Sequence, residues 1–154
     1  MFVCSLGKKS RKAAALAALA LLLVVLCAVI GIERKEKIPP YATSDEAGRF
    51  FTEVSDSDSI DGFLSQFDLS AEKKPLLKDK VSVPSEFDSV YEKYNELQKK
   101  SGFDLSRFKG AEVNRLVLKE KGADERITLL IYKGHVIGAH ISTGEFGSDY
   151  RPLS

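Results

Sequence analysis

The fold of this chain is decided by two apolar runs joined by a tight turn, in the sequence RITLLIYKGHVIGAHIST over residues 126–143. β-Branched and other apolar residues dominate both runs, and each run is short enough to be a strand. The pair Lys133-Gly134 between them suits a two-residue hairpin turn, because glycine tolerates positive φ. The sequence therefore predicts two antiparallel strands, over about 126–132 and 135–143.

The same turn predicts the register of this hairpin. Counting outward pairs Tyr132 with His135, Ile131 with Val136, Leu130 with Ile137, and Ile127 with His140. Apolar side chains then occupy both faces of the sheet, and a small sheet seldom buries two faces by itself. Either helices and the chain over 146–153 cover the second face, or a partner does.

Further strands are predicted upstream of this hairpin. The apolar period is two over 112–119, which predicts a third strand. The short stretch Val81-Ser82-Val83 alternates like a brief strand and is ended by Pro84. The same sheet is therefore predicted to have three strands, or four if this stretch joins it.

Two helices are also predicted, and both carry an apolar stripe at helical spacing. The first follows a Ser-Asp alternation over 55–59. This stretch does not match the residue pattern of a calcium-binding loop, so it is interpreted as a linker that supplies a helix N-cap. The second runs from about 86 to 101, with Ser85 as its N-cap and Gly102 closing it. The first stripe is Ile60, Phe63, Leu64 and Phe67, and the second is Phe87, Val90, Tyr91, Tyr94 and Leu97. The predicted fold is α+β, with two helices packed on an antiparallel sheet of three or four strands.

Residues 13–32 predict an N-terminal transmembrane helix, because 19 of these 20 residues are hydrophobic and none is charged. A helix of this length matches the roughly 30 Å hydrocarbon core of a bilayer. A cleaved signal peptide and lipid attachment at Cys27 are the alternatives to an uncleaved signal-anchor. A small excess of basic residues before the span favours a cytoplasmic head. The predicted organisation is a basic head (1–12), a membrane anchor (13–32), a tether (33–56) and an extracytoplasmic domain (57–154).

The charge and the cysteines exclude several functions for the outer domain. The formal net charge of +1 includes four basic and no acidic residues before residue 33, so the remainder carries −3. That charge does not favour a nucleic-acid partner. Both cysteines, Cys4 and Cys27, lie in the head and the span. The outer domain therefore has no disulfide or cysteine nucleophile, and the sequence predicts no cofactor.

Three stretches carry a resemblance to a known family: VSVP over 81–84, FDSVYEKYNELQKKSGFDL over 87–105, and LIYKGHVIG over 130–138. In order and spacing they resemble small membrane-anchored Firmicutes proteins that share an extracytoplasmic domain of unknown function. The resemblance covers about residues 57–141. It implies an N-terminally anchored protein whose domain lies outside a Gram-positive-type cell, and it implies no catalytic residue.

The residues that could carry chemistry form no recognisable catalytic constellation. His135 and His140 are five positions apart on a strand, which predicts opposite faces and no joint metal site. On the second helix, Tyr94 extends the apolar face, while Asn95 and Gln98 lie toward its edge and either present amides to a ligand or tie the helix to a loop. The candidate binding residues are therefore Tyr94, Asn95, Gln98 and His140, and no catalytic or metal-binding residue is predicted.

The sequence favours a membrane-tethered extracytoplasmic binding or regulatory module, with single-pass location in the cell membrane, over an enzyme. Its predicted partner is an envelope protein or peptide, added as a strand to an exposed edge such as 112–119 or 81–83. The alternative is a cell-envelope hydrolase that uses carboxylates or His140, which requires a pocket with convergent polar groups.

Overall fold

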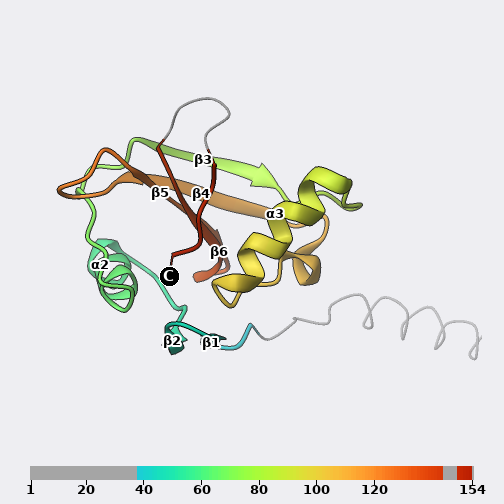
Figure 1. Ribbon diagram of the computed structural model, residues 1–154, viewed down its shortest axis with the longest axis horizontal. Coiled ribbons are helices and arrows are strands. Elements are labelled where there is room, and N and C mark those ends of the chain that lie inside the picture. Colours follow the sequence, from blue (N-terminus) through green and yellow to red (C-terminus); the bar gives the residue numbers. More distant parts are fainter. Residues whose placement is uncertain (1–37, 144–148, 154) are drawn as a thin grey trace, which may run out of the picture. The chain divides into compact units, whose positions relative to one another are not determined.

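The computed structural model describes residues 38–143 and 149–153, which form one α+β unit (Figure 1). The elements in chain order are β1 (Tyr41–Ser44), β2 (Gly48–Phe51), α2 (Ser57–Ser65), β3 (Leu77–Ser82), α3 (Ser89–Lys100), the 3₁₀ helix η1 (Leu105–Phe108), β4 (Glu112–Lys119), β5 (Arg126–Tyr132) and β6 (His135–Ser142). The predicted head and membrane span lie outside the described residues. Within the described ranges, no helix is long and apolar enough to cross a membrane.

A four-stranded antiparallel sheet in the order β3-β4-β5-β6 organises the domain. The predicted strands at 112–119 and 126–132 are confirmed with the same bounds, and β6 ends one residue before its predicted end. The strand predicted over 81–83 also exists, but β3 begins earlier because Leu77 to Ser82 pair residue by residue with β4. The sheet therefore has four strands, with β3 and β6 at its edges.

The predicted hairpin turn is confirmed, but the predicted register holds for only two residue pairs. Lys133 and Gly134 both have positive φ, as a type I′ turn requires. Beyond Ile131 the register shifts by one residue, so that Leu130 pairs with Gly138 and Ile137 is the extra residue of a β-bulge. The predicted pairs Leu130–Ile137 and Ile127–His140 are therefore wrong. The observed pairs are Leu129–Ala139, Thr128–His140 and Ile127–Ile141.

Helix α3 explains where the bulge lies. A Cβ added to Gly138 would lie 3.0 Å from Oε1 of Gln98 and 3.1 Å from Cδ2 of Leu105. The backbone N–H of Ala139 donates to the same Gln98 oxygen at 2.7 Å. The glycine next to the bulge thus lets α3 approach the backbone of β6, and the shifted register places Ala139 in the same core as its partner Leu129.

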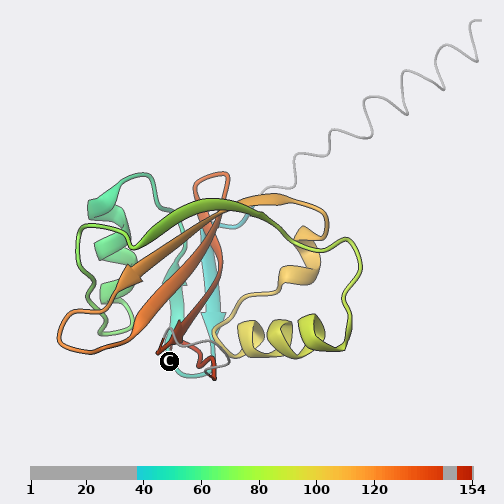
Figure 2. The same cartoon turned by 90° about the horizontal axis from the view of Figure 1, so that it is seen from above.

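Two hydrophobic cores fill the two sheet faces, as the apolar residues on both faces predict. Figure 2 shows α2 on one side of the sheet and α3 with η1 on the other. The α2-side core consists of Phe50, Val54, Phe63, Leu64, Ala71, Phe103, Leu116, Leu118, Ile127, Leu129, Val136, Ala139, Ile141 and Leu153. The α3-side core consists of Val83, Leu105, Val113, Leu130 and Ile137. Helices of the chain itself therefore cover the second face.

Both helices are confirmed, but α3 begins later than predicted. The Asp56 side chain caps α2 in a reciprocal capping box with Ser59. At α3 the N-cap is Asp88, not Ser85, and the Asp88 carboxylate accepts from the N–H groups of Val90 and Tyr91. With this start, Val90 lies in the first turn and is 72% exposed, so its predicted burial is wrong.

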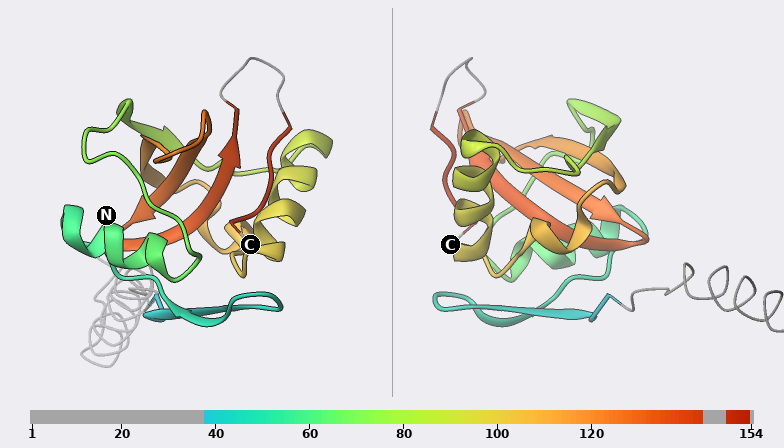
Figure 3. Two further views of the ribbon diagram at one scale, coloured as in Figure 1. Left: turned by 60° about the vertical axis from the view of Figure 1, so that its left-hand side comes forward. Right: turned by 90° about the vertical axis from the view of Figure 1, so that its right-hand side faces the viewer.

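Residues 41–51 form a β-hairpin, so the predicted tether over 33–56 does not hold for this segment. Figure 3 shows the hairpin lying against one end of the domain. Phe50 is buried in the α2-side core, with its ring centroid 4.9 Å from that of Phe67 and 5.6 Å from that of Phe103. The tether prediction failed because the partners of Phe50 come from distant parts of the sequence.

The chain over 149–153 returns along β6. Arg151 and Ile141 exchange two backbone hydrogen bonds of 3.0 Å, and the Arg151 guanidinium pairs with Glu125, the residue before β5. Leu153 is buried in the α2-side core. This segment occupies part of the β6 edge, whereas β3 has no strand on its outer side among the described residues.

Candidate functional site

Two of the four predicted binding residues meet. The hydroxyl oxygen of Tyr94 lies 2.9 Å from Nδ1 of His140. Burial, with a smaller contribution from the nearby Arg115 charge, lowers the pKa of His140 to about 4, so the ring is neutral near pH 7. Burial also raises the pKa of Tyr94, whose neutral hydroxyl can donate to Nδ1. The ring of Tyr150 covers His140 at a centroid distance of 4.4 Å.

The other two predicted binding residues tie the helix to its surroundings. Gln98 is fully buried, and its Oε1 accepts from the N–H of Ala139, next to His140 in the chain. Asn95 turns toward η1, where its Oδ1 accepts from the N–H of Leu105 at 2.8 Å. Its Nδ2 donates to the Asp104 carboxylate at 3.0 Å. A ligand at Asn95 would have to displace these internal bonds.

The His140 environment lacks the partners of a hydrolytic site in the described part of the chain. The ring nitrogens hydrogen-bond there only to Tyr94. The prediction that His135 and His140 project to opposite faces assumed regular alternation along the strand. The bulge lies between these two residues and interrupts that alternation, so the prediction does not hold. The two rings have separate partners, because Nδ1 of His135 lies 3.5 Å from the Thr52 hydroxyl. Residues 38–143 and 149–153 contain no group of three His, Cys, Asp or Glu side chains that could hold a metal ion.

The outer edge of β3 is a different kind of surface, because it presents backbone groups that no strand pairs within residues 38–143 and 149–153. The N–H of Val83 donates to the carbonyl of Ala111 at 2.9 Å, which fixes the phase of the β3–β4 ladder. Backbone groups alternate in direction along an antiparallel strand. The groups of every second residue therefore turn outward, and these residues are Lys78, Lys80 and Ser82.

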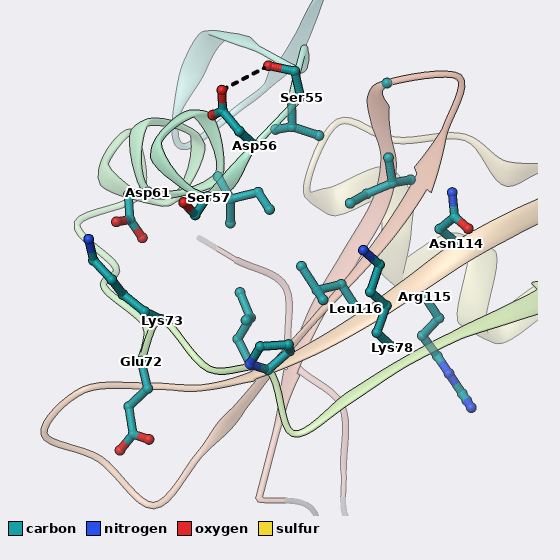
Figure 4. A pocket seen from close by; sticks show the side chains of 16 residues that line it. Ser55, Asp56, Ser57, Asp61, Glu72, Lys73, Lys78, Asn114, Arg115 and Leu116 are labelled. Carbon is teal, nitrogen blue, oxygen red and sulfur yellow. Dashed lines mark hydrogen bonds between the residues drawn. The ribbon is translucent and has the colours of Figure 1, made fainter.

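A cleft of about 610 Å³ lies beside this edge, on the α2 side of the sheet (Figure 4). Its floor is apolar and includes Leu116 and Leu118 of β4 and Ile131 of β5. One wall is the start of α2 with the residues before it, and the other is formed by β3 and the loop that precedes it. Concave sites with an apolar floor and a few polar groups are the usual form of binding pockets.

Carboxylates and ammonium groups both line the cleft, and the loop before β3 contributes one of each, Glu72 and Lys73. Asp56 and Asp61 lie on the α2 wall, and Lys78 rises from β3 beside Leu116 (Figure 4). The guanidinium of Arg115 points away from the cleft and forms a two-fold ion pair with Asp79, with one N–O distance of 2.9 Å. Among the described residues, Lys78 has no ion pair, so its ammonium is available to an anionic group at the edge of the sheet.

Sequence reasoning identified the β3 edge in part and missed the cleft. Of the two edge strands suggested for strand addition, 112–119 is wrong, because β4 lies between β3 and β5. The stretch 81–83 does lie at an edge. The alternation of Leu77, Lys78, Asp79, Lys80 and Val81 is the signal that could have found the whole edge. The cleft has no such signal, because its lining comes from segments far apart in the sequence.

The fold and this site define a small α+β domain in which a cleft lies next to a sheet edge that no other described strand covers. A model of the family described as a domain of unknown function (DUF4830) matches residues 62–141, and the chain belongs to this family. The match includes β3, α3 and the four-stranded sheet. No curated protein and no solved structure matches the chain. The predicted resemblance is thus confirmed for the domain of unknown function, while the membrane anchor and the Firmicutes origin stay predictions.

Proposed function

We propose that the chain is a membrane-tethered, extracytoplasmic binding module that holds an extended segment of an envelope protein or peptide along β3. The observation that carries the proposal is the row of outward-facing backbone groups on β3, with no strand beside them in the described part of the chain. Strand addition satisfies such groups by main-chain hydrogen bonds, and neighbouring pockets select the side chains. The proposed attachment to the membrane is based on the apolar residues 13–32, the predicted anchor.

The other edge of the sheet supports β3 as the binding edge. On β6, Glu53 pairs with His135 near the turn and Arg151 pairs with Ile141 near the other end. An incoming strand would have to displace these contacts. On β3 it would displace no strand of the described residues, and the cleft beside Lys78 has room for its side chains.

Crosslinking in the native cells tests this proposal with a matched pair of variants. A photo-crosslinker at Ser82 of the full-length protein should capture an envelope partner, whereas one at Lys93 on the exposed side of α3 should not. The capture should disappear in Lys80→Pro, which removes an outward N–H but no hydrogen bond to β4. It should persist in Lys80→Ala, which keeps the N–H. Equal capture by the two Lys80 variants would refute strand addition.

The anchor has its own test, independent of the partner. The full-length protein should sediment with the membrane fraction, and deletion of residues 1–32 should release the domain into the soluble fraction. Protease added to intact cells from which the wall is removed should cut the domain. A domain that stays protected until the membrane is lysed would show the opposite orientation.

A further inference from the structure

We infer that the segment added to β3 alternates acidic and apolar side chains, with the acidic ones on the side of Lys78 and the cleft. This inference rests on the proposed strand addition and names the chemistry of the partner. It follows from a difference between the two faces of β3, because an added strand places its own side chains alternately on those same two faces.

On the α2-side face, β3 presents positive charge to a neighbouring strand. Lys78 and Lys80 point to this face, opposite Leu116 and Asn114 of β4. Lys80 forms an exposed ion pair of 2.6 Å with Glu112, whereas Lys78 has no ion pair among the described residues. Of the acidic side chains that line the cleft, Asp56 and Asp61 lie on the far wall, and Glu72 lies in the loop that precedes β3, five residues before the start of that strand. A side chain directly across from Lys78 would therefore meet an ammonium group before any carboxylate, and opposite charges in directly facing pairs are favourable.

On the α3-side face, β3 presents apolar groups. Leu77 is 43% exposed, and Val81 is half-buried against the α3-side core. Phe87 and Tyr91 pack against that same core. The charged residue between Leu77 and Val81 is Asp79, which is already paired with Arg115. Apolar side chains of an added strand would therefore extend the α3-side core without leaving a charge unpaired.

The spacing of the preferred segment follows from the strand geometry. Lys78 and Lys80 are two residues apart, so the side chains that face them on an added strand are also two residues apart. The residue between those two acids faces the other side, near Asp79, and its neighbours on that side face Leu77 and Val81. The recognised pattern is thus acidic-apolar-acidic-apolar in an extended segment.

Three short fluorescent peptides of equal length test the inference, one alternating Glu with Val, one Lys with Val and one Ser with Val. Fluorescence anisotropy with the full-length protein in detergent should give tightest binding for the Glu-Val peptide. We expect a preference of about tenfold over the Lys-Val peptide at low salt, falling as salt rises. Lys78→Glu should reverse this order, and Lys93→Glu on α3 should leave it unchanged.

The outcomes separate the inference from the proposed function. Equal binding of the three peptides that is lost in Lys80→Pro would overturn the acidic preference and leave strand addition standing. Binding that Lys80→Pro does not weaken, or no binding of any peptide, would overturn both. As a control, the melting temperature of each variant is compared with that of Lys80→Ala. Equal melting temperatures would show that a loss of binding does not come from a loss of fold.

Discussion

Protonation of His140 should destabilise the domain between neutral and mildly acidic pH. The ring is 8% exposed, and its Nδ1 is bound to the Tyr94 hydroxyl at 2.9 Å. The aromatic ring of Tyr150 covers it, and the Arg115 charge on the same face disfavours a second positive charge. Neither tyrosine carries a negative charge that would offset an imidazolium in this buried position, so the folded protein should resist protonation that the unfolded chain accepts.

The size of the effect follows from the two pKa values. The folded-state pKa of about 4 lies below the ordinary value of 6.5, and this difference corresponds to about 3 kcal/mol at about 1.4 kcal/mol per pKa unit. Because the folded-state value is the lower one, the unfolded state binds the proton first. The contribution is complete above about pH 6.5 and is lost as the pH falls toward 4. By pH 5 about 2 kcal/mol should be gone.

Urea unfolding of the domain at a series of pH values between 7 and 5 measures this loss. His140→Asn keeps an acceptor near Nδ1 for the Tyr94 hydroxyl but cannot titrate. It should be less stable than the wild type at pH 7 by about 1–2 kcal/mol, and nearly equal to it at pH 5. The carboxylates of Asp79, Asp104 and Glu125 have lowered pKa values, so their contributions are lost below this window.

Two results would refute the reasoning about His140. One is the same loss of stability between pH 7 and 5 in the wild type and in His140→Asn. The other is a titration of the His140 ring, followed by NMR in the folded domain, with a midpoint near 6.5. Either result would mean that the ring is solvated or that a partner stabilises its protonated form.

Three further substitutions test the packing around α3 and α2 by urea unfolding. Gly102→Ala should cost about 3 kcal/mol, because φ is +83° there and a Cβ would lie 2.5 Å from the carbonyl oxygen of Thr43; wild-type stability would contradict that approach. The opposite is expected of Gly62→Ala, which should stabilise α2 by about 0.5–1 kcal/mol, since φ is ordinary and no atom lies within 4 Å of the added Cβ. Gln98→Ala should cost about 3 kcal/mol and speed amide exchange of Ala139, whose N–H loses its acceptor; an amide that stays protected would argue for another acceptor.

The separation of the cleft from the predicted binding residues affects how the family can be studied. Substitutions at Asn95 or Gln98 should disturb the attachment of α3 to η1 and to β6, so a lost phenotype there would report on folding. Substitutions at Lys78 change an exposed side chain with no ion pair among the described residues. Lys78 is therefore the better position from which to probe binding.

The sequence by itself determined the elements that depend on near neighbours. The strands β4 and β5 and the Lys133-Gly134 turn were predictable, because alternation and glycine φ act within a few residues. The same holds for the α2 stripe and for Gly102 after α3. The apolar character of both sheet faces was also readable, and it correctly required a covering layer on each.

Only the tertiary structure decided the features that depend on residues far apart in the chain. The bulge at Ile137 accompanies a contact from α3, in which the Gln98 side chain accepts a hydrogen bond from the β6 backbone at Ala139. No local sequence pattern indicates that contact. Phe50 joins the core through rings more than ten residues away, so its hairpin looked like part of a tether. Which strand is an edge depends on the order of all four strands, and that order exposes the backbone of β3 and forms the cleft beside it. Periodicity records which side of an element is apolar, but only packing determines what that side meets.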